Sequence, residues 1–233
     1  DEKGYKMSKS IGNTVSPQSV INNMGADILR LWVASTDYTS EMKISDQILK
    51  RNADTYRRIR NTARFLLSNL NDFDPKENQL NVSEMVLLDQ LAIKRVALLN
   101  QQIMDEYNNY SFHKIIHLLH NFCVNDMGGF YLDILKDRLY TMPTDSVGRR
   151  SAQTALHLIS ESLTRWIAPI LSFTAEEIWK QMPERKEESV FLSEWLVLPK
   201  IESNIDWDRL NEINTVVLKA LEVARDDGKI GSP

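Results

Sequence analysis

The sequence is short of cysteine, glycine and proline, and it has no long hydrophobic run. Its 233 residues include one cysteine, eight glycines and seven prolines. The single Cys123 excludes an internal disulfide and fits a reducing compartment. A membrane-spanning helix needs about 18 or more apolar residues in a row, which this sequence lacks. These absences predict a cytoplasmic protein with no membrane partner.

A positive net charge is also absent. The formal net charge is −4 at pH 7, which gives no global attraction to nucleic acid, so RNA binding would depend on a local cluster of basic residues. Apolar residues make up 42% and charged residues 26%, proportions that are typical of a globular protein. A chain of this length can bury a sizeable core in one large domain, or in one domain with an appendage.

The sequence does contain a series of long amphipathic stretches. Ser16-Pro17 indicates a helix start and Gly25 a helix stop. Asp27 is the expected cap of a second short helix, and Ser45 or Asp46 opens a first long helix that runs to about residue 73. Long helices joined by short loops predict a mainly α fold, an antiparallel helix bundle preceded by the two short helices. The further helices are expected over 83–108, 112–140, 149–168, 174–182 and 207–227.

Several local features are expected within this bundle. Gly128-Gly129 indicates a close crossing between the helix over 112–140 and a neighbour. Thr174 and Glu177 have the spacing of a capping box, and Asp206 is the expected cap of the last helix. A short extended piece is expected over 190–192.

The first long helix carries a basic stripe on the side opposite its apolar arc. On a helical wheel, with about 100° per residue, four basic residues fall together and form this stripe: Lys50, Arg57, Arg60 and Arg64. Arg51 and Arg58 flank the stripe, and on this helix only Asp46 and Asp54 oppose its charge. Arginine offers phosphate a bidentate partner, so the stripe suits contact with an RNA backbone. A solvated helix face explains the same pattern equally well.

A second basic feature lies in the loop KMSKS, which spans 6–10 and is called the lysine loop below. Lys6 and Lys9 lie three residues apart among serines, between Gly4 and Gly12. Two ammonium groups on a loop that can close could stabilise negative charge on a departing pyrophosphate, a contribution of about 3 to 4 kcal/mol per well-placed group. On charge alone, a solvated lysine loop is the simpler interpretation.

The string KMSKS resembles the signature loop of class I aminoacyl-tRNA synthetases, which binds the phosphates of ATP during amino-acid activation. The resemblance continues in ILRLWVASTDY and YRRIRNTARFLLSNL, which are similar to the isoleucyl-tRNA synthetase family. Further on, PILSFTAEEIW and YLDILKDRLY resemble the anticodon-binding region of that family. The similarity covers essentially the whole chain and is strongest before residue 75.

This resemblance implies roles for the residues of the lysine loop. Lys6 and Lys9 would be catalytic, contacting the ATP phosphates and stabilising the pyrophosphate, with Lys9 the stronger candidate. Ser8 and Ser10 would belong to the same ATP-binding loop as hydroxyl donors. Asn13, with Gly12, would shape the exit of the loop.

The resemblance also implies a division of the chain and an assignment of the basic stripe. Residues 1–45 would hold the lysine loop and the connecting, stem-contact domain. Residues 46–233 would be the anticodon-binding helix bundle, truncated at its C-terminal end. The stripe would then contact the backbone of the isoleucine tRNA, tRNA(Ile), through Lys50, Arg57, Arg60 and Arg64.

The activity implied is that of a monomeric ligase, acting only in a longer protein. Such an enzyme uses ATP with Mg²⁺ to activate isoleucine and transfers it to tRNA(Ile). This chain lacks the second class I signature, HIGH, and the Gly-rich nucleotide-binding fold, so we expect it to be a fragment that is inactive alone and holds no cofactor. The cysteine cluster that binds zinc in many family members would lie outside the chain.

Several alternatives stay open. A fragment of a valyl- or leucyl-type synthetase would look similar, because these families differ little in the lysine loop. A non-catalytic helical scaffold that binds RNA or protein is a different class of function. A metal site is a third alternative, with candidate ligands on the helix expected over 112–140: His113, His117, His120 and Cys123. One straight helix cannot place four ligands around a zinc ion, so no metal is expected. Aromatic residues of the type that stack on RNA bases are Tyr107, Tyr110, Trp166, Trp179, Trp195 and Trp207.

Overall fold

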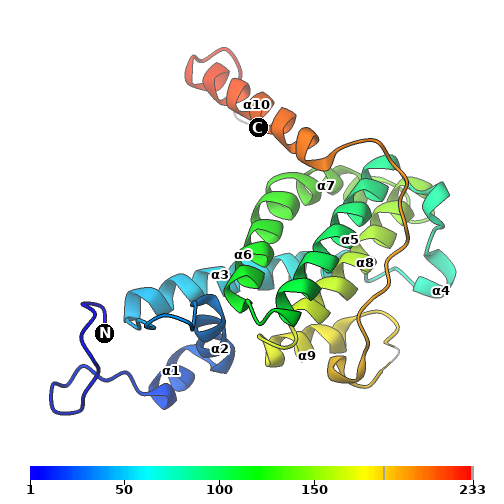
Figure 1. The fold of residues 1–233 in the computed structure, drawn as a ribbon. Helices are drawn as coiled ribbons and strands as arrows, with labels where there is room; N and C mark the ends of the chain where they lie inside the picture. The colour runs from blue at the N-terminus through cyan, green and yellow to red at the C-terminus, as the bar shows by residue number, and fades with distance from the viewer. Residues whose placement is uncertain (186, 232–233) are drawn as a thin grey trace.

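The structure is a computed structural model that describes residues 1–185 and 187–231. The described residues form helices and turns but no strand, which confirms the mainly α prediction (Figure 1). The α-helices are α1 (Pro17–Met24), α2 (Ala26–Ser35), α3 (Asp46–Ser68), α4 (Pro75–Asn78), α5 (Leu87–Asn108), α6 (Phe112–Asn121), α7 (Leu132–Thr141), α8 (Val147–Ile167), α9 (Ser172–Gln181) and α10 (Trp207–Asp226). The other helical segments are the 3₁₀-helices η1 (Val82–Glu84) and η3 (Val190–Leu192) and the π-helix η2 (Phe122–Tyr131).

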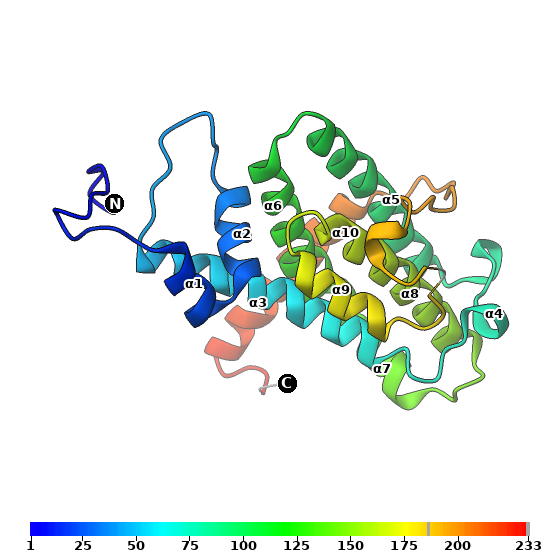
Figure 2. The ribbon, with the colours of Figure 1, turned by 90° about the horizontal axis from the view of Figure 1, so that it is seen from below.

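The bundle is built around α3, α5, α6 and α8. Helix α5 packs against α6 and α8, and α8 also packs against α3 (Figures 1 and 2). Apolar residues at helical spacing face inward, because only one side of each helix can be buried in such a packing. The fully buried positions of this core include Ile59, Leu66, Ile93, Val96, Ile103, Ile115, Leu156, Ile159 and Trp166.

Helix α2 contributes side chains to two cores, because Leu29 and Trp32 pack against a small core and other residues of α2 face the main bundle. Val20 of α1 joins Ile44 and Leu49 in a small separate core. Leu31 and Ala34 on α2 belong instead to the core of the main bundle. Helix α2 is therefore shared between the two cores. The division of the chain at residue 45 stays a prediction.

Two of the expected helix caps are wrong. Asp27 lies within the first turn of α2, whose N-cap is Gly25, and α9 begins at Ser172, so Thr174 and Glu177 do not form a capping box. The carboxylate of Asp27 instead accepts hydrogen bonds from the backbone N–H of Phe173 at 3.3 Å and of Thr174 at 2.7 Å. Asp27 thus caps α9, a helix far away in the sequence, which local spacing could not reveal.

The single helix expected over 112–140 is in fact α6, the π-helix η2 and α7. The expected close crossing at Gly128-Gly129 is wrong, because both glycines are exposed. A Cβ atom at Gly128 would lie 3.1 Å from the carbonyl oxygen of Cys123, and one at Gly129 would lie 3.3 Å from that of Val124. The glycines therefore relieve crowding within the π-helix itself, five residues along the chain.

Other local expectations are mostly confirmed. Gly25 ends α1 with φ 93°, in the left-handed region, and Ser45 caps α3 by accepting a hydrogen bond from the N–H of Ile48 at 3.2 Å. Asp206 caps α10 by accepting from the N–H of Asp208 at 2.9 Å.

Two other local expectations differ from the structure. The piece expected to be extended over 190–192 is the 3₁₀-helix η3, and α5 begins later than expected.

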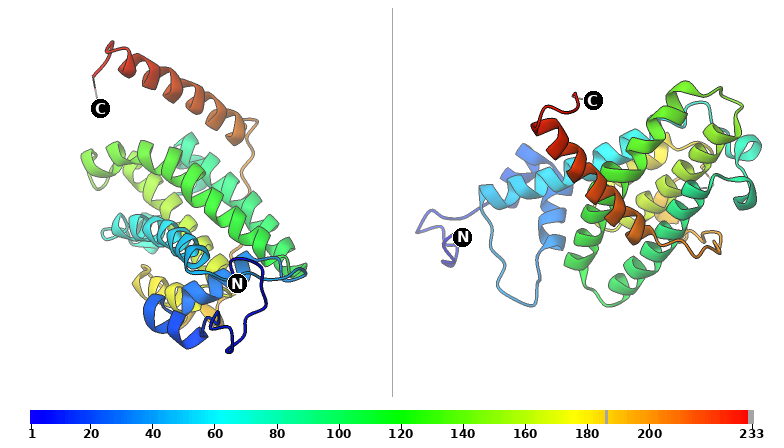
Figure 3. Two further views of the ribbon diagram at one scale, coloured as in Figure 1. Left: turned by 90° about the vertical axis from the view of Figure 1, so that its left-hand side faces the viewer. Right: turned by 90° about the horizontal axis from the view of Figure 1, so that it is seen from above.

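Helix α10 stands apart from the bundle (Figure 3), and Trp207 is its one buried residue in the described part of the chain. No helix among the described residues is long and apolar enough to cross a membrane.

Candidate functional site

Asn13 ties the lysine loop into a compact turn. Its Oδ1 accepts a hydrogen bond from the N–H of Ser8 at 2.8 Å, and its Nδ2 donates to the carbonyl oxygen of Lys6 at 3.3 Å. The N–H of Gly12 donates to the carbonyl of Ser8 at 3.1 Å, and Gly12 has φ 76°, where a side chain would be strained. One amide side chain, just beyond the loop, thus binds backbone groups of its first half.

The charged groups of the lysine loop face solvent. Lys6 and Lys9 are both exposed, and neither forms an ion pair within residues 1–185 and 187–231. The hydroxyl oxygens of Ser8 and Ser10 lie 2.6 Å apart and share a hydrogen bond. The loop therefore presents two ammonium groups, three residues apart, to an anion.

The basic stripe lies on the exposed side of α3, as its spacing predicted. Arg57 pairs with Asp54 on the same helix. Arg60 forms a bidentate ion pair with Glu177 of α9, with distances of 2.8 Å from Nη1 to Oε2 and 2.7 Å from Nη2 to Oε1. Lys50 and Arg64 form no ion pair with the described part of the chain. These last two are the groups of the stripe most available to a phosphate.

The pairing of Arg60 with Glu177 shifts the pKa of both groups. The hydrogen bonds from Arg60 hold the pKa of the Glu177 carboxyl below its usual value. The same hydrogen bonds raise the pKa of Arg60. Glu177 is therefore ionised near neutral pH and reduces the net charge of the stripe at this point.

The stripe lies between two grooves along α3. A groove of about 380 Å³ separates α3 from α9 and is lined by Arg60, Arg64, Ser68 and Gln181. On the other side, a groove of about 460 Å³ is lined by Arg58 and by the exposed backbone at Gly128 and Gly129. The stripe is thus a ridge along which an extended, negatively charged polymer could lie.

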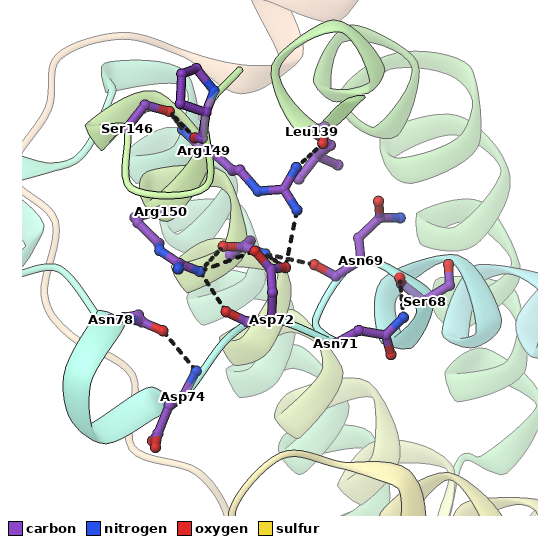
Figure 4. A network of polar contacts seen from close by, with 12 residues as sticks. Ser68, Asn69, Asn71, Asp72, Asp74, Asn78, Leu139, Ser146, Arg149 and Arg150 are labelled. Atoms are coloured by element: carbon purple, nitrogen blue, oxygen red, sulfur yellow. Dashed lines mark hydrogen bonds and ion pairs between the residues drawn. The ribbon is translucent and has the colours of Figure 1, made fainter. Parts of the chain in front are cut away.

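Two arginines of α8 do not add to this basic face. Arg149 Nη2 lies 3.0 Å from Asp72 Oδ1, and Arg150 Nη1 donates to the carbonyl oxygen of Asp72 at 2.7 Å (Figure 4). Burial of Asp72 acts to raise the pKa of its carboxyl, but the donors on Arg149 and Gln153 outweigh burial and lower it. These arginines therefore anchor the loop between α3 and α4 to the start of α8.

Most of the aromatic residues considered for base stacking belong to the core. Trp166, Trp179 and Trp207 are buried, and Tyr107 is half-buried with its hydroxyl donating to the carbonyl of Trp166 at 2.7 Å. Trp195 is also half-buried. Tyr110 alone of the six is exposed, so it is the one residue of this set that could stack on a base without rearrangement.

The histidines and the cysteine of the third long segment do not gather at one point. Cys123 is buried, and burial raises the pKa of its thiol to about 12, whereas His117 and His120 are exposed. No group of three or more potential ligands was found in the part of the chain that the structure describes.

Reasoning from the sequence missed three residues that shape the site. Glu177 neutralises part of the stripe, and Asp27 and Tyr56 join α9 to α2 and α3. No local pattern could indicate these contacts, because each joins residues that are more than 100 positions apart, as the separation of 117 between Arg60 and Glu177 illustrates.

Comparison with known proteins gives these features a context. Residues 1–45 match the family described as tRNA synthetases class I (I, L, M and V), and residues 89–233 match the anticodon-binding domain of tRNA ligase. The chain is 56% identical to the isoleucine–tRNA ligases of Teredinibacter turnerae and Proteus mirabilis and 54% identical to that of Halorhodospira halophila. These alignments cover 99–100% of the chain and 25% of each relative, so the chain spans about a quarter of their length.

A solved structure shares the fold. The chain resembles the Agrobacterium radiobacter K84 agnB2 LeuRS in its ternary complex with tRNA and LeuAMS, with a TM-score of 0.61 and 18% identity, over 85% of this chain and 23% of that one. The resemblance inferred from KMSKS and the later strings is confirmed by the sequence relatives. The chain belongs to the tRNA ligase family, with its anticodon-binding domain over residues 89–233 and its similarity to isoleucine–tRNA ligases over essentially its whole length.

Proposed function

We propose that the chain is the part of an isoleucine–tRNA ligase that supplies the ATP-phosphate loop and a surface for tRNA. The observation that carries this proposal is its identity of 53–56% to isoleucine–tRNA ligases, in alignments that cover 99–100% of the chain. By the same identity, isoleucine rather than valine or leucine is the amino acid. The chain is expected to be inactive without the rest of the ligase.

In the whole ligase, the carboxylate of isoleucine attacks the α-phosphate of ATP and pyrophosphate leaves. The isoleucyl group then passes to the terminal adenosine of tRNA(Ile). Lys6 and Lys9 stabilise the charge that develops on the pyrophosphate, and their exposure on a compact turn supports this role. Mg²⁺ accompanies ATP and supplies further charge neutralisation there, while Ser8 and Ser10 belong to the same ATP-binding loop.

The basic stripe binds the tRNA backbone through Lys50, Arg57, Arg60 and Arg64. Lys50 and Arg64 carry most of this contact, because Arg57 and Arg60 already have carboxylate partners. Phosphate contacts position an RNA without reading its sequence. The ligase works as a monomer in the cytoplasm, a compartment consistent with the single, free Cys123.

One experiment with two groups of variants tests this function in the full-length ligase that carries the chain. Lys9→Ala should slow isoleucine-dependent ATP–pyrophosphate exchange by about 10²- to 10³-fold, because one charge-stabilising donor is removed from the transition state. The affinity for tRNA(Ile) should not change. The double variant Lys50→Ala/Arg64→Ala should do the opposite, weakening tRNA binding and lowering the slope of log K against log salt by about 0.7 to 0.9 per lost phosphate contact.

Lys219→Ala, at an exposed lysine of α10, is the matched control and should change neither quantity. Equal losses of exchange and tRNA affinity in Lys9→Ala would contradict the role of the lysine loop. Salt-insensitive binding in every variant would favour a protein-binding scaffold. Competition by valine or leucine tRNA as strong as that by tRNA(Ile) would argue for the related ligases.

A further inference from the structure

A polar joint connects the segment that carries the lysine loop to the helix that carries the basic stripe. Helix α9 packs against both α2 and α3 (Figure 2). At this point the buried Asp27 of α2 accepts hydrogen bonds from both the N–H and the hydroxyl of Thr174, at 2.7 and 2.6 Å. Asp27 is 7% and Thr174 3% exposed, so these hydrogen bonds are shielded from water.

Arg30, nearly one turn along α2, strengthens the joint from the other side. Its Nε donates to the carbonyl oxygen of Ile170 and its Nη2 to that of Pro169, both at 2.8 Å. These carbonyls lie at the turn that ends α8 and precedes α9, where the helix dipole favours a positive group. Asp27 and Arg30 therefore hold α2 against the turn between α8 and α9 through charges of opposite sign.

The hydrogen bonds continue from Thr174 to the basic stripe. The hydroxyl of Tyr56 lies 3.0 Å from Thr174 Oγ1, and Arg60 Nη1 lies 3.4 Å from the Tyr56 hydroxyl. Since Thr174 donates its proton to the Asp27 carboxylate, Tyr56 must donate to Thr174, and Arg60 donates to Tyr56.

The donors therefore point one way along the whole chain of hydrogen bonds, from Arg60 through Tyr56 and Thr174 to Asp27. Such chains polarise one another, so each bond strengthens its neighbours. Glu177 holds Arg60 in place with two hydrogen bonds from one turn beyond Thr174. The hydroxyls of Tyr56 and Thr174 together link Arg60 to Asp27, and Tyr56 is the member that contacts Arg60.

We propose that Tyr56 is a positioning residue that couples tRNA bound at the basic stripe to the orientation of the segment carrying the lysine loop. A phosphate held by Arg64, which lines the same groove as Arg60, polarises Arg60. The Tyr56 hydroxyl transmits this through Thr174 to the buried carboxylate that holds α2. The proposal rests on the proposed function, because it assumes that tRNA binds the stripe and that the lysine loop binds ATP. The lysine loop acts while pyrophosphate leaves, so the step to measure is isoleucine-dependent ATP–pyrophosphate exchange with tRNA(Ile) bound.

The test uses Tyr56→Phe in the full-length ligase that carries this chain. The variant removes one hydroxyl and leaves both the Arg60–Glu177 ion pair and the cap of α9 in place. The kcat of ATP–pyrophosphate exchange with tRNA(Ile) bound should fall by about 3- to 10-fold, the effect of one hydrogen bond. The KM for tRNA, and ATP–pyrophosphate exchange measured without tRNA, should stay within about twofold because each site is intact.

Variants at Thr174 keep the test decisive if Tyr56→Phe folds poorly. Thr174→Val removes the hydroxyl and should lower the same kcat, whereas Thr174→Ser keeps it and should restore the wild-type rate. The double variant Tyr56→Phe/Thr174→Val should be no slower than the worse single variant, because both interrupt one chain. Tyr140→Phe, at an exposed tyrosine of α7, is the control.

An unchanged exchange kcat with tRNA(Ile) bound in folded Tyr56→Phe would overturn the coupling, as would additive losses in the double variant. A rise in the KM for tRNA without a fall in kcat would make Tyr56 a binding contact instead and would also overturn it. The proposed function fails separately, when the wild-type ligase does not charge tRNA(Ile) or when Lys9→Ala leaves exchange unchanged. The two failures are therefore distinguishable.

Discussion

At the scale of single residues, His157 is a buried titratable group without a charged partner. It is 7% exposed, its ring centroid lies 5.7 Å from that of Phe73, and its Nδ1 has no hydrogen-bond partner within the described residues. It lies in the wall of a cavity of about 580 Å³ beside Trp179 and the Glu161–Arg165 ion pair. Burial, the main cause, lowers the pKa of His157 to about 4. The folded protein therefore keeps this imidazole neutral.

This shift predicts a loss of stability on mild acidification. The unfolded imidazole has a pKa near 6.5, so between about pH 6.5 and 4 the unfolded chain binds more protons and stability falls as pH falls. The difference corresponds to about 3 kcal/mol in the free energy of unfolding once the pH is near the folded pKa. Urea unfolding between pH 7 and 4.5 should show the slope in the wild type and lack it in His157→Gln.

His117→Gln, at an exposed histidine, should leave the slope unchanged. The lowered pKa values of the Asp72 and Glu177 carboxyls act in another range. Their contributions are present above the ordinary carboxyl pKa, about 4, and are lost below it. An equal pH slope in wild type and His157→Gln would show that His157 is not the group responsible.

At the scale of elements, α9 depends on a cap from another helix. The N-cap position of α9 is Leu171, which has no side-chain acceptor, and Asp27 of α2 supplies the missing one. A helix N-terminus leaves backbone donors unpaired unless a side chain or solvent accepts from them. The N-terminus of α9 therefore obtains its side-chain cap through the docking of α2.

Replacing Asp27 should lower the free energy of unfolding for two reasons, the loss of the cap and the loss of the partner of Thr174. Asp27→Ala should lower the free energy of unfolding by about 1 to 2 kcal/mol for the lost cap, with a further loss for the buried Thr174 hydroxyl that it leaves unpaired. Denaturant unfolding of the variant measures this change. Asp145→Ala, at an exposed loop aspartate, should shift stability by less than about 0.5 kcal/mol. Similar shifts in both variants would mean that the Asp27 cap adds no stability.

At the scale of the whole molecule, one buried carboxylate joins four elements. Asp89 of α5 is fully buried and accepts hydrogen bonds from the Tyr131 hydroxyl of η2 at 2.7 Å and from Arg138 of α7 at 2.7 and 2.8 Å. The hydroxyl of Ser151 on α8 also donates to it. The register of these helices is therefore set by one fully satisfied polar cluster inside an apolar core.

Removing the charge of Asp89 should be costly, because Arg138 would stay largely buried without its partner. Asp89→Asn should lower the free energy of unfolding by about 3 to 5 kcal/mol, as expected when one member of a buried ion pair is lost. Asp105→Asn, on the exposed side of the same helix, is the control and should have a small effect. A loss below about 1 kcal/mol in Asp89→Asn, measured by urea unfolding, would contradict this role.

The sequence by itself determined what depends on neighbours in the chain. Apolar spacing placed α3, α5 and α8, and Ser45, Gly25 and Asp206 marked helix ends because a cap bonds to backbone groups only a few residues away. The lysine loop and the basic stripe were visible for the same reason. A run of local residues also carries the family resemblance, which the comparison with known proteins confirmed.

Only the tertiary structure decided which charges stay available and how the parts are joined. Arg60 looks like any residue of the stripe until packing brings Glu177, 117 positions away, against it. Asp27 and Thr174 looked like caps of their own helices, but packing pairs them across 147 positions. Spacing along one helix reports which residues share a face. The partner that a face meets depends on packing between helices, which no local pattern records.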